Sequence, residues 1–340
     1  MDKEKITSIK EILKNSSSIV IVAHTNPDGD AIGASLALKR FLANSGFNAQ
    51  VVVPNKFHNF LDWMPGSDEI LIGTNEFKKN ETLIYDADLI FCLDFNSISR
   101  VDQLSNSLAC SKAKKVLIDH HLSPEPFVDF LFSDIKSSST SELVYDFIVE
   151  IGGANSIDEE IANCLFVGIM TDTGSFSFSC NNAKTFLVVA ELIKAGLNVE
   201  RVHKLIFDNN NESRLRLLGF CLSANMVVLH EFSTAYIHLS KEELEMHHFE
   251  AGDTENVVNY ALSIKGINLA VLLMEKEEYV KISMRSKGDF SVNDLARNHF
   301  NGGGHRNAAG GMYDLPLANA IEHLESILPE YHDQIKNSLK

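Results

Sequence analysis

Short apolar runs alternate with helical patterns through the first half of the chain, and this alternation limits the fold more than any other feature of the sequence. The runs are rich in Val, Ile and Leu and occupy residues 18–24, 49–54, 89–94 and 115–119. Helical patterns cover residues 31–46, 140–153, 158–172 and 183–196. Strands that alternate with helices form mostly parallel sheets with helices on both faces. We therefore predict an α/β fold with a mostly parallel sheet in this half.

The pattern changes in the second half. Residues 269–286 predict two strands that turn near Glu277, and in the second strand apolar residues alternate with Lys281, Ser283 and Arg285. A helix at 292–300, a glycine-rich loop and a final helix from about 316 complete a smaller α/β domain. The length of 340 residues also favours two domains. We predict a first domain at 1–196, a helical linker at 197–224 and a second domain at 225–340.

Composition excludes several classes of function. The net charge of −16 argues against a protein that grips a long nucleic-acid duplex through its phosphates. Five scattered cysteines without a C-x-x-C pair are typical of reduced thiols. The charged N-terminus does not resemble a signal peptide, and no apolar run approaches the roughly 20 residues that span a bilayer. We expect a cytoplasmic protein that does not enter a membrane.

Acidic residues and histidines follow the apolar runs at the points where the predicted elements end. They are His24, Asp28, Asp30, Asp94, His120 and Asp172. Each alone has an ordinary explanation as a turn residue, a helix cap or a core histidine. Together they lie where the loops of an open α/β sheet converge on one crevice. Four carboxylates and two imidazoles exceed the needs of one tetrahedral ion and favour two Mn²⁺-like ions. Such a pair activates water and neutralises phosphoryl charge, which suits hydrolysis of a phosphoester.

The second landmark is the glycine-rich stretch NGGGHRNAAGG at 301–311. A flexible linker is the simplest explanation, but structured patterns bracket the stretch and it contains His305 and Arg306. Glycines let a backbone approach a ligand closely, and their amides can form an anion-binding nest. Arg285 offers a bidentate clamp for phosphate or carboxylate. We expect this region to contact an anionic substrate.

At this point the motifs match a known family. The segments HTNPDGDAIGAS, LDFNSISR, LIDHH and TDTGSF occur in this order, followed by RSKGDFSVNDLARNHFNGGGHRNAAGG. This ordered set covers nearly the whole chain and resembles the DHH/DHHA1 phosphoesterases, and within them the NrnA-like group of nanoRNases and pAp phosphatases. The resemblance implies a DHH domain joined by a helical linker to a DHHA1 domain, with the active site in the cleft. It also implies two Mn²⁺ ions, for which Mg²⁺ or Co²⁺ could substitute.

The resemblance also implies a role for each matching residue. One ion would be held by His24, Asp28 and Asp94. The other would be held by Asp30, Asp94, His120 and Asp172. Catalysis would depend on His121 facing the substrate phosphate or leaving group, Asp119 orienting a ligand and Asp94 bridging the ions. Substrate contacts would come from Arg100, Arg285, Ser286, Gly303, Gly304 and His305. One departure is Asn301, which replaces the first of the four glycines common before the histidine.

The favoured function is hydrolysis of short oligoribonucleotides to mononucleotides and of 3′-phosphoadenosine 5′-phosphate (pAp) to AMP. One alternative is a phosphodiesterase of a cyclic-dinucleotide pathway, acting on c-di-AMP or its linear product pApA. Another is a non-catalytic RNA-binding module on the same fold, although the complete ligand set argues against it. A RecJ-type exonuclease would need a further domain to hold a long strand, and a family II pyrophosphatase lacks the glycine–histidine loop. The expected partners are short RNA, pAp or dinucleotides, and a homodimer is left open.

Overall fold

The computed structural model describes residues 2–75, 77–208, 210–250 and 252–339, and the chain divides into two units between positions 209 and 210. The helices and strands of the first unit are α1 (Lys3–Asn15), β1 (Ile19–Ala23), α2 (Gly29–Asn44), β2 (Ala49–Val53), β3 (Leu71–Ile72), α3 (Phe77–Tyr85), β4 (Leu89–Leu93), α4 (Ser105–Cys110), β5 (Lys114–Asp119), β6 (Phe130–Ser133), α5 (Thr140–Gly152), α6 (Glu159–Asp172), α7 (Ala183–Lys194) and α8 (Val199–Phe207). The predicted strands and helices of this half are all present.

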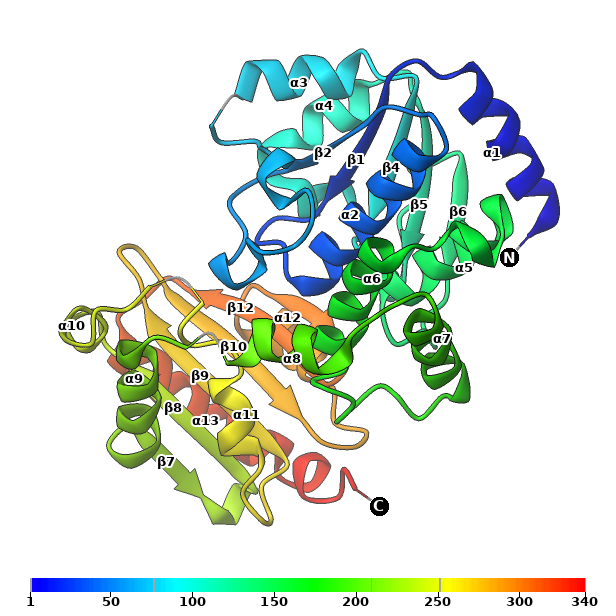
Figure 1. Cartoon of the computed structure of the whole chain (residues 1–340). Helices are drawn as coiled ribbons and strands as arrows, with labels where there is room; N and C mark the ends of the chain where they lie inside the picture. The colour runs from blue at the N-terminus through cyan, green and yellow to red at the C-terminus, as the bar shows by residue number, and fades with distance from the viewer. Residues whose placement is uncertain (1, 76, 209, 251, 340) are drawn as a thin grey trace. The chain divides into compact units, whose positions relative to one another are not determined.

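The sheet of the first unit has six strands in the order β3-β2-β1-β4-β5-β6, and all neighbours run parallel (Figure 1). The chain enters the sheet at the central strand β1 and adds β2 and β3 on one side. It then returns to add β4, β5 and β6 on the other side of β1. The direction therefore reverses between β1 and β4, which pair from Ile19 opposite Leu89 to Ala23 opposite Leu93. In open parallel sheets the crevice at such a reversal, outside the carboxyl ends of the strands, is where ligands bind.

Helices cover both faces of this sheet, and for that reason the central strands are apolar throughout. Every residue of β1 and β4 is buried. Ile19 and Ile21 belong to the larger core under α1, α2, α5 and α6, whereas Val20 and Val22 belong to the core under α3 and α4. The helices α2 and α6 pack backbone to backbone, because a Cβ at Gly33 would lie 2.5 Å from the carbonyl oxygen of Cys164.

The second unit contains α9 (Glu212–Ser223), β7 (Met226–Leu229), β8 (Thr234–Leu239), α10 (Lys241–Met246), α11 (Val257–Leu262), β9 (Leu269–Glu275), β10 (Val280–Ser286), α12 (Val292–His299), β11 (Gly303–His305), β12 (Ala308–Tyr313) and α13 (Leu317–Lys336). Its sheet has the order β11-β12-β10-β9-β8-β7 and is antiparallel except for the parallel pair β8 and β9. The two strands predicted around Glu277 are β9 and β10.

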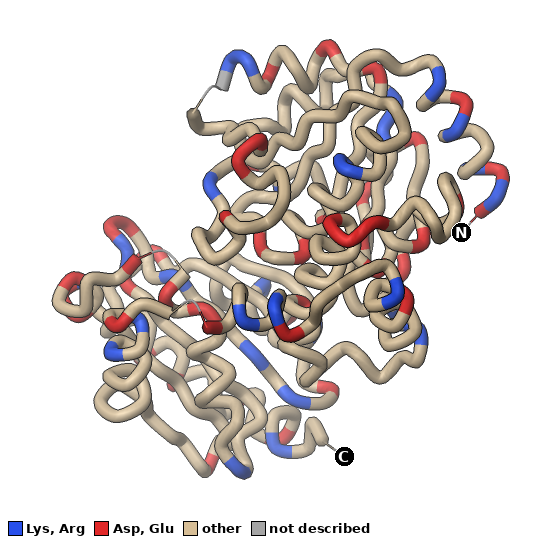
Figure 2. Tube along the Cα trace, viewed as in Figure 1, with Lys and Arg blue, Asp and Glu red and all other residues tan. Residues whose placement is uncertain are grey.

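The two faces of this second sheet differ. Val280, Ile282 and Met284 point into a core with α12 and α13. The opposite face is apolar on β8 and β9, where it packs against α9 and α11, but on β10 it presents Lys281 and Arg285. Lys and Arg residues accordingly gather along β10 (Figure 2).

The glycine-rich stretch is a β-hairpin, not the loop that its composition predicts. Gly303–His305 form β11, which pairs with β12 from Gly303 opposite Gly310 to His305 opposite Ala308. The glycines are needed because the strands approach closely: a Cβ at Gly302 would lie 2.0 Å from the Gly310 carbonyl oxygen. Throughout the described residues, every helix is too short or too polar to cross a membrane.

Candidate metal centre

The six predicted ligands lie together at the reversal point of the first sheet. Each is placed by the end of an element: His24 follows β1, Asp28 caps α2 and Asp30 lies in its first turn, Asp94 follows β4, His120 follows β5, and Asp172 is the last residue of α6. Since β1 and β4 are neighbours and β5 lies beside β4, three of these side chains emerge from adjacent strands. The sequence reasoning that placed them at one crevice is consistent with this geometry.

His24, Asp28 and Asp94 form the first group. The His24 Nε2 atom lies 3.3 Å from Asp94 Oδ2 and 3.9 Å from Asp28 Oδ1. On its other side His24 donates its Nδ1–H to the backbone oxygen of Thr25 at 2.8 Å. That hydrogen bond fixes the ring orientation and leaves Nε2 for a metal ion. Donor atoms bound to one ion through bonds of about 2.1 Å lie roughly 3 to 4 Å apart, so these spacings fit a single cation.

Asp30, His120 and Asp172 form the second group. The His120 Nε2 atom lies 3.4 Å from Asp172 Oδ2 and 4.0 Å from Asp30 Oδ2. The same Nε2 atom lies 3.7 Å from Asp94 Oδ1. Asp94 therefore turns one carboxylate oxygen to His24 and the other to His120, which is the geometry of a bridge between two ions.

Asp94 combines an unusual backbone with a buried charge. Its φ angle is +65°, in the left-handed region that few residues other than glycine, asparagine and aspartate adopt. The side chain is only 2% exposed. Burial alone would raise the pKa of Asp94, but the hydrogen bond to His24 and the charges of His121 and His24 hold this pKa below its ordinary range. The carboxylate is therefore ionised and available to cations.

The remaining acids repel one another. Burial raises the pKa of Asp30, and the charges of Asp94 and Asp172 raise it further. Burial also raises the pKa of Asp172 to about 6. Burial would lower the pKa of His120, yet Asp172, Asp94 and Asp30 together raise it to about 9. Carboxylates crowded in this way call for positive charge, and divalent ions supply it. The donor set of oxygens and imidazole nitrogens therefore fits two such ions.

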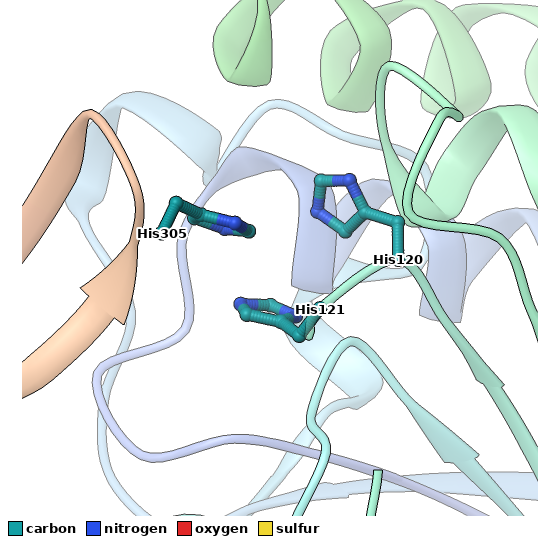
Figure 3. A group of neighbouring side chains, drawn as sticks. All are labelled: His120, His121 and His305. Carbon is teal, nitrogen blue, oxygen red and sulfur yellow. The ribbon is translucent and has the colours of Figure 1, made fainter. Parts of the chain in front are cut away.

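His121 differs from its neighbour His120 in its partner. The two rings lie edge to face with their centroids 5.1 Å apart (Figure 3). His121 donates Nδ1–H to Asp119 Oδ1 at 2.6 Å, and Asp119 is fully buried. The acid thus fixes the tautomer of His121, with the proton on Nδ1. This pairing separates the two histidines: His120 faces three carboxylates through Nε2, whereas His121 is oriented by one buried acid.

Arg100 belongs to the first unit and lies close to this centre. It is half-buried, its backbone oxygen accepts a hydrogen bond from Thr25 N at 2.8 Å, and its positive charge is close enough to act on the His24 ring. The expected phosphate-contacting arginine is therefore near the first group of ligands.

The other predicted substrate residues lie in the second unit, and three of them share one face of its sheet. Ala308 on β12 is opposite Arg285 on one side and opposite His305 on the other. Residues directly opposite one another in antiparallel strands share a face, so Arg285 and His305 project from the same side. Gly303 lies two positions before His305 and shares that face.

Three further features concern the hairpin and the strand beside it. The amide of Gly304 donates to Asn293 Oδ1 at 2.9 Å, so this amide does not join the anion-binding nest that the sequence suggested. Ser286 donates its hydroxyl to the Phe290 backbone oxygen at 2.7 Å. Asn301 has a φ of +45°, which explains the departure from glycine, since asparagine tolerates this region better than most residues.

The residues that support Asp30 were not predicted from the sequence. Thr140 and Ser141, at the start of α5, donate their backbone amides to the two oxygens of Asp30 at 2.6 and 2.8 Å. Both residues are fully buried. The run of hydroxyl-bearing residues at 137–141 before an apolar helix could have signalled a helix cap, but not which carboxylate it would meet.

Comparison with known proteins is consistent with this geometry. The sequence matches the DHH family, N-terminal domain, over residues 18–169 and the DHHA1 domain over residues 236–337. A Thermus thermophilus protein named bifunctional oligoribonuclease and PAP phosphatase NrnA is 32% identical over 96% of this chain and 94% of its own length. The Bacillus subtilis cyclic-di-AMP phosphodiesterase GdpP is 27% identical, but this chain covers only 50% of it.

A solved structure agrees over almost the whole chain. The crystal structure of an exopolyphosphatase-related protein from Bacteroides fragilis superimposes with a TM-score of 0.95 at 40% sequence identity. The match covers 99% of this chain and 98% of that one. The two-unit fold is therefore shared with a protein of the same extent.

Proposed function

The chain belongs to the DHH family, in the NrnA-like group, and also contains a DHHA1 domain; from that premise we propose that it is a metal-dependent phosphoesterase. Its substrates are short oligoribonucleotides, which it degrades to mononucleotides, and pAp, which it converts to AMP. The observation that carries the proposal is the pair of ligand groups joined by Asp94, with Oδ2 3.3 Å from His24 and Oδ1 3.7 Å from His120. A relative of equal extent named for these two activities supports the choice of substrate.

The ligands divide into two sets. His24, Asp28 and Asp94 would hold one divalent ion, and Asp30, Asp94, His120 and Asp172 would hold the other. When bound, two such ions supply a water activated near neutral pH and offset the charge of a phosphoryl group. We propose Mn²⁺ as the ion, because mixed carboxylate and imidazole ligation suits it, with Mg²⁺ or Co²⁺ as substitutes. Asp94→Asn removes the bridging charge and keeps the shape, so it should release metal and abolish turnover. A variant with two bound ions and a normal rate would contradict the assignment.

His121 acts on the substrate in this proposal. Asp119 holds its proton on Nδ1 through the 2.6 Å hydrogen bond and fixes the orientation of the ring. A ring held in this way can bind the substrate phosphate or protonate the leaving group. His120→Ala should therefore lower metal content, whereas His121→Ala should keep the metal and lose rate. Equal loss of metal in the two variants, measured by elemental analysis, would show that the pair has been divided wrongly.

The second unit selects the substrate. Arg285 and His305 project from one sheet face, whereas all six proposed metal ligands belong to the first unit. A charge-assisted hydrogen bond from Arg285 is worth about 1.5–3 kcal/mol, or roughly 10- to 150-fold in binding. Arg285→Ala and His305→Ala should therefore lower kcat/KM strongly for pAp and short RNA. Bis-p-nitrophenyl phosphate, which can fill only the metal centre, should be affected little. A parallel loss on both kinds of substrate would remove the division of labour.

The deciding experiment compares products from pAp, pApA, c-di-AMP and a five-nucleotide RNA, each with Mn²⁺ and with a chelator. We expect metal-dependent release of AMP from pAp and of mononucleotides from RNA. Turnover confined to c-di-AMP or pApA would favour the cyclic-dinucleotide alternative, and binding without turnover would favour an RNA-binding module. We further propose a cytoplasmic location, in keeping with five free cysteines. Sedimentation would test the homodimer.

A further inference from the structure

Thr140 contacts two of the proposed metal ligands at once. Its backbone amide donates to Asp30 Oδ2 at 2.6 Å, and its hydroxyl donates to Asp94 Oδ1 at 2.8 Å. Thr140 is fully buried, Asp30 is 1% exposed and Asp94 is 2% exposed. The two acids come from different elements, α2 and the end of β4, and a third element therefore joins them. Asp94 Oδ1 is also the oxygen that faces His120.

The local sequence explains why α5 can make these contacts. Ser139 caps the helix by accepting the Glu142 amide on its hydroxyl at 3.1 Å. The first amides of a helix have no partner within the helix, so those of Thr140 and Ser141 are free to serve Asp30. The positive end of the helix dipole also points at this carboxylate. Glu142 anchors the same turn from below, since its Oε2 accepts hydrogen bonds from Ser138 and Thr185 at 2.7 Å each.

We propose that Thr140 is a positioning residue of the metal centre, which orients Asp94 through its hydroxyl and Asp30 through its amide. A carboxylate that bridges two ions must present both oxygens in fixed directions. The hydroxyl proton of Thr140 occupies one lone pair of Asp94 Oδ1 and directs the other. The amide of Thr140 holds the Asp30 carboxylate in place, so a single residue sets the relative position of two ligands. The inference rests on the proposed assignment of Asp30 and Asp94 as ligands.

Thr140→Val tests the hydroxyl alone, because valine keeps the shape of threonine and the backbone amide. Hydrogen-bonding partners of metal ligands are typically worth 10- to 100-fold in metal affinity, and we expect a loss in this range. Thr140→Ser restores the hydroxyl and should recover most of the affinity. Thr185→Val is the matched control, because it also removes a buried threonine hydroxyl that donates to a carboxylate. Its acceptor is Glu142 of α5, which is not a proposed ligand.

The measurement is titration calorimetry of Mn²⁺ into metal-stripped full-length protein, with urea unfolding of the metal-free forms alongside. A merely structural role predicts equal effects of Thr140→Val and Thr185→Val on affinity, and that result would overturn the proposal. Failure of Thr140→Ser to recover affinity would also overturn it. If Thr140→Val does not fold, Thr140→Ala is compared with Thr185→Ala under the same criteria. Wild-type protein that binds no Mn²⁺, Mg²⁺ or Co²⁺ would refute the metal centre itself, and the role of Thr140 with it.

Discussion

Gly168 on α6 is the position where one added methyl group should disturb the metal centre most directly. A Cβ there would lie 1.9 Å from Ser141 Oγ, 2.7 Å from Ser141 Cβ and 2.6 Å from Asp30 Oδ1. Rotation of the Ser141 hydroxyl relieves only the first contact. The Asp30 Oδ1 atom would have to retreat from 2.6 Å to the 3.4 Å at which ordinary contact begins, although the Ser141 amide holds this oxygen and the Thr140 amide holds the other oxygen of the same carboxylate.

The added methyl group should affect both the free energy of unfolding and the affinity for metal. Overpacking a core costs about 1–3 kcal/mol, and replacing glycine by alanine inside a helix returns about 1 kcal/mol. Gly168→Ala should therefore lower the free energy of unfolding by at most about 2 kcal/mol and leave the protein folded. The affinity for Mn²⁺ should fall by about 10- to 100-fold, because Asp30 is displaced from His120 and Asp172.

Titration calorimetry with Mn²⁺ and urea unfolding together provide the assay. Gly219→Ala is the control, since a Cβ at Gly219 in α9 meets no atom of the described residues within 4 Å, and it should bind Mn²⁺ as the wild type does. If Gly168→Ala binds Mn²⁺ within twofold of the wild type, the reasoning that the missing Cβ positions Asp30 is refuted.

Three further predictions concern other parts of the molecule. Asp158 caps α6 and binds Arg40, so Asp158→Ala should lower the free energy of unfolding by about 1 kcal/mol at pH 7. Partial burial acts to raise the pKa of Asp158, but its hydrogen bonds lower this pKa on balance. The contribution of Asp158 to the free energy of unfolding is therefore present above the unfolded pKa of about 3.9 and is lost as the pH falls through the folded pKa. Urea titrations should show the stabilities of the wild type and the variant converging below about pH 4. The added Cβ of Gly302→Ala would clash with backbone atoms, so this variant should lower the free energy of unfolding of the second unit by about 1–3 kcal/mol. The added Cβ of Gly303→Ala has its nearest contact at 3.4 Å and should not lower it. Equal melting temperatures of the two variants would contradict this prediction. Among the cysteines that the structure describes, Cys110 alone is exposed, so a thiol reagent at pH 8 should label native protein rapidly at one site that Cys110→Ser removes.

The parts of the fold that sequence could predict are those fixed by local pattern. The run IVIVA is apolar at every position because β1 is buried on both faces. The end of this run therefore predicted correctly that His24 lies at the carboxyl end of a strand. Asp28 could be placed in the same way, since it precedes a helical pattern and caps α2. These inferences need only a strand, a turn and a helix in succession.

Features that depend on distant segments could not be predicted. Thr140 serves Asp94, which lies 46 positions away, and no local pattern encodes that meeting. The glycine-rich hairpin has the composition of a loop because glycine weakens strand patterns, whereas here the close approach of Gly302 to Gly310 requires glycine in or beside strands. The left-handed backbone of Asp94 is likewise set by its surroundings.

That left-handed backbone limits how this position can change over generations. Only glycine, asparagine and aspartate adopt such a φ angle at little cost, so most replacements at Asp94 damage both the fold and the chemistry. Asparagine and glycine are exceptions, and the codons of aspartate reach either by a single nucleotide change. Both would preserve the backbone while removing the bridging carboxylate. A gene duplicate could therefore pass in one mutational step from the proposed enzyme to a folded protein that lacks the proposed bridging carboxylate but keeps the proposed substrate contacts of its second unit.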